Sequence, residues 1–289
     1  MRCSHAPTSP LCYPPHTMIE FWQACLIVCP AAALGGAINS VAGGGTLVTF
    51  PALVWVLDAI VGSGTGAILA NGTNSVALAP GAFSGSWAYR RELKHLRSQA
   101  LWLALPSLAG GTLGAALVVA GSEQAFRTAI PWLIGAATTL FILQPKLTLP
   151  SNLPPSTSHT PRSNRPSILV LLAQLAISTY GGYFGAGIGI LMLSSLSLLQ
   201  LQSIHHANAL KTVLAGLING ISVVVFITHD KVYWPLAIPM IASAMLGGWL
   251  GAAWARKLDR HVVRRIVITI GCALTTWYFA KEFLFSSYT

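Results

Sequence analysis

The sequence predicts an all-α membrane protein with many spans, built from two homologous halves of about five helical segments each. Hydrophobic residues make up 54% of the 289 positions and charged residues only 8%, whereas a soluble domain carries about 25% charged residues. The charges gather between long apolar stretches, which is typical of a polytopic membrane protein. These stretches also recur in two series, and glycines interrupt both series at the same place, as in many secondary transporters.

The two series align segment by segment. Residues 35–51 read GGAINSVAGGGTLVTFP, and residues 181–193 read GGYFGAGIGILML. A helix that opens with polar residues is expected after each of these glycine breaks. The later segments match as well, through the pairs Pro106 with Pro239, Gly114 with Gly247, and Pro131 with Val267. Each half is therefore expected to be one copy of a repeat with Gly-broken helices.

We divide the chain into four parts. Residues 1–17 are rich in proline and polar residues and lack the apolar core of a signal peptide, so they are expected to be disordered, with Met18 as an alternative start. Residues 18–144 form the first repeat and residues 167–285 the second. Residues 145–166 between them have no periodicity and little apolar content, which predicts a flexible cytoplasmic linker.

Ten apolar segments are expected, five in each half: 19–38, 46–60, 66–89, 99–120 and 127–144, followed by 168–184, 188–201, 207–228, 232–254 and 263–284. The second segment of each half is shorter than the ~20 residues of a perpendicular span. It is therefore either a tilted span or one arm of a re-entrant hairpin.

The basic residues predict the orientation. With five segments per half, the 90–97 loop, the linker and residues 256–265 fall on one face; they hold four, three and five Lys or Arg, twelve in all. Eight crossings would divide the basic residues ten to six, so the positive-inside rule favours five segments per half. An odd number of segments inverts one half relative to the other and places both termini outside.

The glycine breaks are the first candidates for a substrate site: Gly43, Gly44 and Gly45 in the first half, and Gly185, Gly187 and Gly189 in the second. Irregular backbone at membrane depth persists only where it is buried in protein or lines a wet cavity. A helix that restarts after a break presents N–H groups and a positive dipole end, which suit an anion. Close helix packing is the alternative, and we assign it to Gly110, Gly111, Gly114, Gly247, Gly248 and Gly251.

Polar residues at the start of the third segments are the second candidates: Asn71, Thr73 and Asn74 in the first half, and Asn208, Lys211 and Thr212 in the second. Alignment places Asn71 opposite Asn208, and Asn74 opposite Lys211. Asn71 and Asn74 lie one turn apart and share a helix face, as do Asn208 and Lys211. A lysine inside a span usually faces a cavity on a substrate path. The alternative is that Lys211 extends its stem to the membrane interface, and the sequence leaves both explanations open.

Several other functions lack support. The seven Asp and Glu residues lie near segment ends, whereas a cation exporter or a carboxylate proton relay needs an acid in mid-span. Metalloprotease, P-loop and nucleophile-elbow motifs do not occur, so we expect no enzymatic activity and no cofactor. Cys25 and Cys29 share a helix face but are explained as small apolar residues, so we expect no metal. Loop residues carry the net charge of +10, which therefore does not indicate nucleic-acid binding.

At these residues the chain resembles the sulfite exporter TauE/SafE family. The likeness rests on four motifs: G-x-I-x-x-x-A-G-G-G from Gly36 to Gly45, Gly72-Thr73-Asn74, FGAGIG from Phe184 to Gly189, and HHANALKT from His205 to Thr212. It extends from Met18 to Phe285, apart from the linker, which is unusually long and rich in proline. The family often carries Asp where this chain has Asn39, so a role for that acid is not expected here.

The resemblance implies a multi-pass protein of the bacterial inner membrane that transports sulfite, sulfonates or related organosulfur anions. Together with the paired breaks, it predicts a secondary transporter that works by alternating access between two inverted halves. Its partners would be the small anion, the lipid bilayer and a coupling proton or ion, with no nucleic acid. A membrane scaffold that shares the fold without transporting anything is the alternative, and an intramembrane enzyme is a third reading.

Overall fold

The computed structural model describes residues 20–41, 44–62, 64–88, 96–147, 166–197, 204–254 and 260–284. These residues form ten α-helices and no β-strand: α1 (Phe21–Val41), α2 (Thr46–Val61), α3 (Ala67–Ala88), α4 (Arg97–Ala120), α5 (Glu123–Leu147), α6 (Ile168–Tyr183), α7 (Ile188–Ser197), α8 (Ile204–Thr228), α9 (Trp234–Trp254) and α10 (Arg260–Leu284). Each of the ten predicted segments is a helix, with small differences at the ends. Residues 1–17 and most of the predicted linker lie outside the described residues.

The described helices have the lengths and surfaces of a membrane protein. Helices α1, α4, α5, α8 and α9 are long and apolar enough to cross a membrane, whereas α2 and α6 have 16 residues each and α7 has ten. Large apolar side chains point outward, among them Leu101, Leu105 and Trp249. Soluble proteins rarely expose such continuous apolar surface, and lipid tails accept it readily. The chain is therefore a multi-pass membrane protein.

The first helix of each half packs on the fourth helix of the other half, α1 on α9 and α4 on α6. Small residues permit this close approach. A Cβ added at Gly247 of α9 would overlap the carbonyl oxygen of Ala33, and a Cβ at Gly36 of α1 would overlap the carbonyl oxygen of Ala244. The two halves are therefore interleaved along these interfaces.

The α4–α6 interface repeats both contacts at the aligned positions. Gly114 takes the place of Gly247 and meets the carbonyl oxygen of Thr179, while Gly182 takes the place of Gly36 and meets Gly111. The packing role predicted for Gly110, Gly111, Gly114 and Gly247 is thus confirmed. Gly248 also lies at the α1–α9 interface, since a Cβ at Gly36 would come within 3.0 Å of its nitrogen, but a Cβ at Gly248 itself would have ordinary clearance, 3.7 Å from the Gly36 oxygen.

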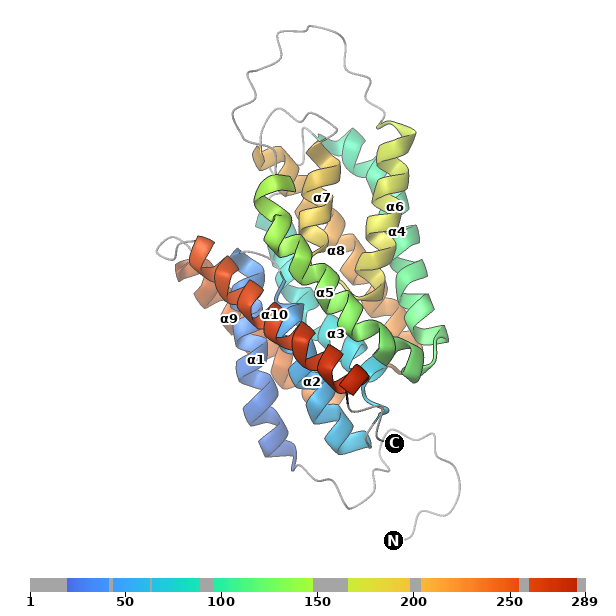
Figure 1. Cartoon of the computed structure of the whole chain (residues 1–289). Helices are drawn as coiled ribbons and strands as arrows, with labels where there is room; N and C mark the ends of the chain where they lie inside the picture. The colour runs from blue at the N-terminus through green and yellow to red at the C-terminus, as the bar shows by residue number, and fades with distance from the viewer. Residues whose placement is uncertain are drawn as a thin grey trace, which may run out of the picture.

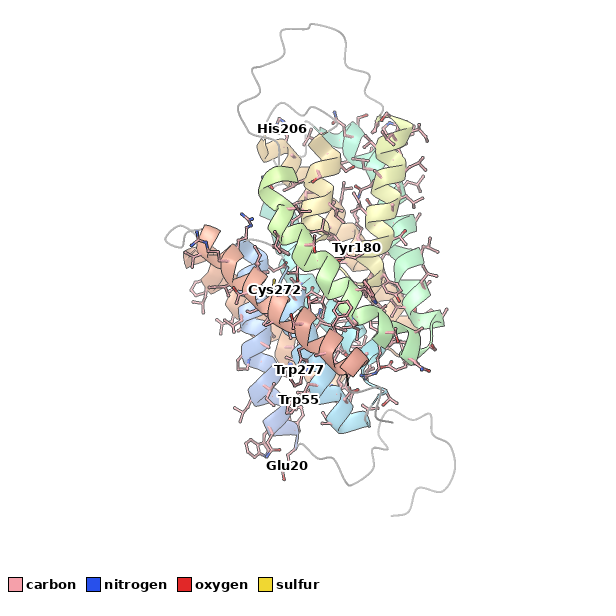
Figure 2. The ribbon with its side chains drawn as sticks, viewed as in Figure 1. Glu20, Trp55, Tyr180, His206, Cys272 and Trp277 are labelled. Carbon is pink, nitrogen blue, oxygen red and sulfur yellow. The ribbon has the colours of Figure 1, made fainter. Side chains whose placement is uncertain are left out.

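The corresponding helices of the two halves also run in opposite directions. Helix α1 begins at the lower end of the bundle in Figure 1, whereas α6 begins at its upper end. Figure 2 places Glu20, just before α1, at the lower end and His206, at the start of α8, at the upper end. The third helices, α3 and α8, contact each other, as do the fifth helices, α5 and α10. This arrangement fits the inverted relation that the sequence predicts.

Arg264 of α10 compensates for a hydrogen-bond donor that a proline removes from α5. Pro145 has no N–H, so the Phe141 carbonyl loses the donor that an α-helix would supply. Arg264 of α10 replaces that donor, because its Nε lies 3.0 Å from the Phe141 oxygen and its Nη2 lies 3.2 Å from the Ile142 oxygen. The guanidinium thus fixes the C-terminal part of α5 against α10.

Candidate functional site

The first glycine break lies between α1 and α2. Gly44 has φ 94°, a left-handed conformation that only glycine adopts without strain. Gly45 then serves as the N-cap residue of α2, without a side-chain cap. A Cβ at Gly45 would overlap the Gly35 carbonyl, and a Cβ at Gly44 would overlap the ring of Phe141. The predicted break is confirmed, and Gly43 lies outside the described residues.

The second glycine break spans residues 184–187 between α6 and α7. Gly185 has φ 82° and Gly187 has φ 78°, so both need the conformational freedom of glycine. The half-buried Tyr180 donates its hydroxyl hydrogen to the Ala186 carbonyl across the break, at 2.8 Å. The prediction that Gly189 belongs to the break is wrong, because α7 already begins at Ile188. Gly187 completes the turn, which allows the next residues to be helical.

A ring contact from α2 and a hydrogen bond from α3 reach the second break. Phe50 follows the first break on α2 and packs edge to face on Phe184 of the second, with ring centroids 5.2 Å apart. Asn71 of α3 donates its amide Nδ2 to the Tyr183 carbonyl at 2.9 Å. This carbonyl precedes the second break, where the helical ladder ends, so Asn71 supplies a donor where the backbone is irregular.

Two asparagines of α3 lie at the breaks, and both are almost completely buried. Asn71 and Asn74 are 1% and 2% exposed. The Asn74 Oδ1 accepts a hydrogen bond from the Thr49 hydroxyl of α2, which also lies 3.2 Å from the Gly45 carbonyl. The predicted common face of Asn71 and Asn74 therefore meets both breaks. Sequence reasoning missed Thr49, although its place one turn after Gly45 could have indicated it.

Thr73 lies on another face of α3. Its hydroxyl donates to the Leu69 carbonyl at 2.7 Å and accepts from the Tyr233 N–H at 2.8 Å. Tyr233 precedes α9, so these bonds fasten α3 to the α8–α9 connection. Residues two apart on a helix point in very different directions. The structure therefore separates Thr73 from the two asparagines with which it was grouped.

Helix α8 contributes the polar residues of the second half. It begins at Ile204, so Lys211 lies about two turns inside the helix. Lys211 is half-buried, and its side chain adjoins Gly189, where an added Cβ would lie 3.5 Å from the Lys211 Cδ. The Thr212 hydroxyl donates to the Asn208 carbonyl one turn earlier, at 2.7 Å. The aliphatic part of the Lys211 side chain therefore lies beside the first turn of α7.

Helix α5 covers both breaks. Its Phe141 ring lies against Gly44, and its Ala137 and Leu140 face Gly187. Figure 1 shows α5 running diagonally across the bundle, with α10 crossing beside it. Two surface hollows lie elsewhere, one on α5 around Ser122 to Trp132 and one on α10 around Val262 to Ile270. Helix α5 thus lies directly against both breaks in this conformation.

A charged cluster that the sequence analysis missed lies at the start of α3. Arg127 of α5 forms ion pairs with Asp58 of α2 and with Glu123, the latter at 3.2 Å. The Glu123 carboxylate also accepts the Ala67 and Ile68 N–H groups, and carboxylates at a helix N-terminus are stabilising. The i, i+4 spacing of Glu123 and Arg127 was visible in the sequence, but only the fold brings Asp58 to them.

The described residues contain no group of three or more His, Cys, Asp or Glu that could hold a metal ion. Cys25 and Cys29 are free thiols on α1. The chemistry gathered at the breaks consists instead of backbone amides, buried carboxamides, hydroxyls and one lysine. Such groups bind and orient a small polar ligand, and they include no nucleophile paired with a base.

Comparison with known proteins agrees with this assessment. The family model described as Sulfite exporter TauE/SafE matches residues 28–278. A Probable membrane transporter protein of Haemophilus influenzae is 28% identical over 82% of this chain and 88% of its own length. The Probable membrane transporter protein YfcA of Escherichia coli K12 is 27% identical over 84% of this chain and 85% of its own. The Probable membrane transporter protein ORF9 of Sinorhizobium sp. is 27% identical over 84% and 88%. No solved structure shows a significant match to the chain.

Proposed function

The chain belongs to the sulfite exporter TauE/SafE family of membrane transporters, and we propose that it carries sulfite, a sulfonate or a related small anion across the bacterial inner membrane. The observation that carries this proposal is the meeting of two glycine breaks with buried asparagines inside the bundle. Gly44 and Gly187 turn the backbone, and Asn71 and Asn74 join the breaks through hydrogen bonds. Discontinuous helices of this kind form the substrate sites of many secondary transporters.

The charge available at the breaks suits an anion. Helices α2 and α7 both begin there, and each helix N-terminus acts as about half a positive charge. Lys211 beside the first turn of α7 adds a full positive charge. A single negative charge in this low-dielectric region would thus be compensated without any metal ion.

Transport would proceed by alternating access between the two halves. Helix α5 packs against Gly44 and Gly187 in this conformation. Opening would require α5 to move away from Gly44 and Gly187 together with α10, to which Arg264 attaches it. Inverted halves would allow the same motion to expose the site on either face. The driving force would be an ion or proton gradient, because the sequence carries no P-loop motif.

Uptake by proteoliposomes tests the proposal. Vesicles that contain the purified protein should accumulate radiolabelled sulfite or a sulfonate with saturable kinetics, and an imposed ion gradient should accelerate uptake. Vesicles without protein, and vesicles with a Gly44→Leu variant that inserts normally, serve as controls. Uptake no greater than in empty vesicles across a panel of sulfite, thiosulfate, sulfonates and carboxylates would instead favour a membrane scaffold.

A further inference from the structure

The carboxamide nitrogen of Asn71 is hydrogen-bonded to a described residue, whereas its carboxamide oxygen is not. A carbonyl can only accept a hydrogen bond, so the bond to the Tyr183 carbonyl must come from the amide nitrogen. This bond fixes which way the carboxamide points. The side-chain oxygen, Oδ1, is left buried and accepts no hydrogen bond from any of the described residues.

An unpartnered oxygen at this position is costly. Asn71 is only 1% exposed, and a buried polar atom without a partner destabilises a protein by about 1–3 kcal/mol. The one-turn neighbour Asn74 differs, since its oxygen accepts the Thr49 hydroxyl. An unsatisfied atom of this kind in a native fold calls for a partner that the described residues do not supply, such as an ordered water or a bound ligand.

The position of this oxygen suggests what that group is. Asn71 borders the second break and lies one turn from Asn74, which borders the first. Amides and the lysine would attract the negative end of an anion, whereas a carboxamide oxygen repels it and accepts only a donor. A bare oxyanion would satisfy the positive groups and leave the Asn71 oxygen unpaired.

We propose that the site selects small oxyanions that carry a hydrogen-bond donor of their own, and that Asn71 Oδ1 accepts that donor. This inference rests on the proposed function and specifies its substrate class. Hydroxyalkanesulfonates have the required chemistry: a sulfonate for the positive groups and a hydroxyl for Asn71. A site built around such an acceptor disfavours an analogue that lacks the hydroxyl, because the oxygen then stays unpaired.

Two sulfonates that differ by one hydroxyl test the proposal. Binding of 2-hydroxyethanesulfonate and of ethanesulfonate to the purified full-length protein would be measured by calorimetry. We expect the hydroxylated ligand to bind about tenfold more tightly, the effect of one net hydrogen bond. In Asn71→Leu the ratio of the two affinities should fall to about one.

Gln174→Leu is the matched control. Gln174 is fully buried between α6 and α4, its amide nitrogen donates to Ser107 and Ser178, and its oxygen also lacks a partner. It lies more than two turns of α6 before the second break, so its loss should leave the affinity ratio unchanged.

The outcomes separate this inference from the proposed function. Equal affinity of the wild type for both sulfonates overturns the inference and leaves anion transport standing. A tenfold preference that persists in Asn71→Leu removes the assigned role of Asn71. If neither these sulfonates nor sulfite binds the wild type, the proposed function fails, and the inference fails with it. Should Asn71→Leu not fold, the wild-type ratio alone decides between selection for a donor and no selection.

Discussion

Gly44 combines two constraints that no other residue type satisfies. Its φ of 94° is left-handed, and the Phe141 ring occupies the position that a Cβ would need. The strained backbone of a non-glycine residue costs about 1–3 kcal/mol, and the clash adds to it. The start of α2, and with it the N–H groups that we propose bind an anion, depends on this residue.

We therefore expect Gly44→Ala to lower both the melting temperature and the rate of anion uptake. Phe141→Ala should relieve the clash but not the backbone strain, so the double variant should recover only part of the lost stability. Gly81→Ala is the control, because Gly81 is exposed on α3 with no atom within 4 Å of an added Cβ. Thermal unfolding and vesicle uptake measure the effects, and normal uptake by Gly44→Ala would reduce Gly44 to a packing residue.

Lys211 is the other residue whose role can be decided by substitution. Lys211→Met keeps the apolar stem and removes the ammonium. We expect a loss of anion affinity of about 1.5–3 kcal/mol, the usual contribution of a hydrogen bond to a charged group. Lys211→Arg should restore little, since a planar guanidinium does not replace a compact ammonium. Near-normal affinity of both variants in binding titrations would support a stem that extends to the interface instead.

At the scale of helices, the axes of α1 and α9, and those of α4 and α6, can approach closely only because glycines lie between them. Gly247 and Gly114 occupy equivalent positions, and each faces a carbonyl oxygen of the partner helix. Any side chain there forces the helices apart, so the consequence concerns the contact between the two halves rather than either half alone.

We expect Gly247→Ala and Gly114→Ala each to destabilise the protein by about 1–3 kcal/mol, the usual cost of overpacking. Gly248→Ala, one residue along on α9, should be close to neutral because a Cβ fits there. Thermal unfolding in detergent with a bound lipid dye would measure all three variants. Equal melting temperatures for Gly247→Ala and Gly248→Ala would contradict the packing argument.

For the whole molecule, the orientation in the membrane follows from the distribution of Lys and Arg. Five segments per half place twelve of these residues on one face, and that face is expected to be cytoplasmic. The C-terminus should then lie in the periplasm. A C-terminal fusion to a reporter that fluoresces only in the cytoplasm should stay dark, whereas a periplasmic phosphatase fusion should be active. A bright fluorescent fusion would overturn the five-segment arrangement.

Much of the fold followed from hydrophobic periodicity. A membrane span must satisfy its backbone internally, so an apolar stretch of sufficient length predicts a helix almost without competition, and all ten predicted segments are helices. Glycine runs within such stretches predicted the breaks, because glycine is unfavourable inside a helix. The predicted face shared by Asn71 and Asn74 was also correct, because helical geometry alone fixes which residues lie one turn apart.

Partners between distant segments were beyond the reach of local patterns. The Thr49–Asn74 bond, the Asp58–Arg127 pair and the Phe141 ring over Gly44 join residues 25 or more positions apart. Thr73 looked equivalent to its neighbours, and only the path of the α8–α9 connection gave it a different role. The sequence by itself thus determined the helices, the breaks and the class of membrane protein, since these depend on local hydrophobicity and backbone chemistry. Tertiary packing alone decided which groups meet at the breaks and left one buried oxygen of Asn71 without a donor among the described residues.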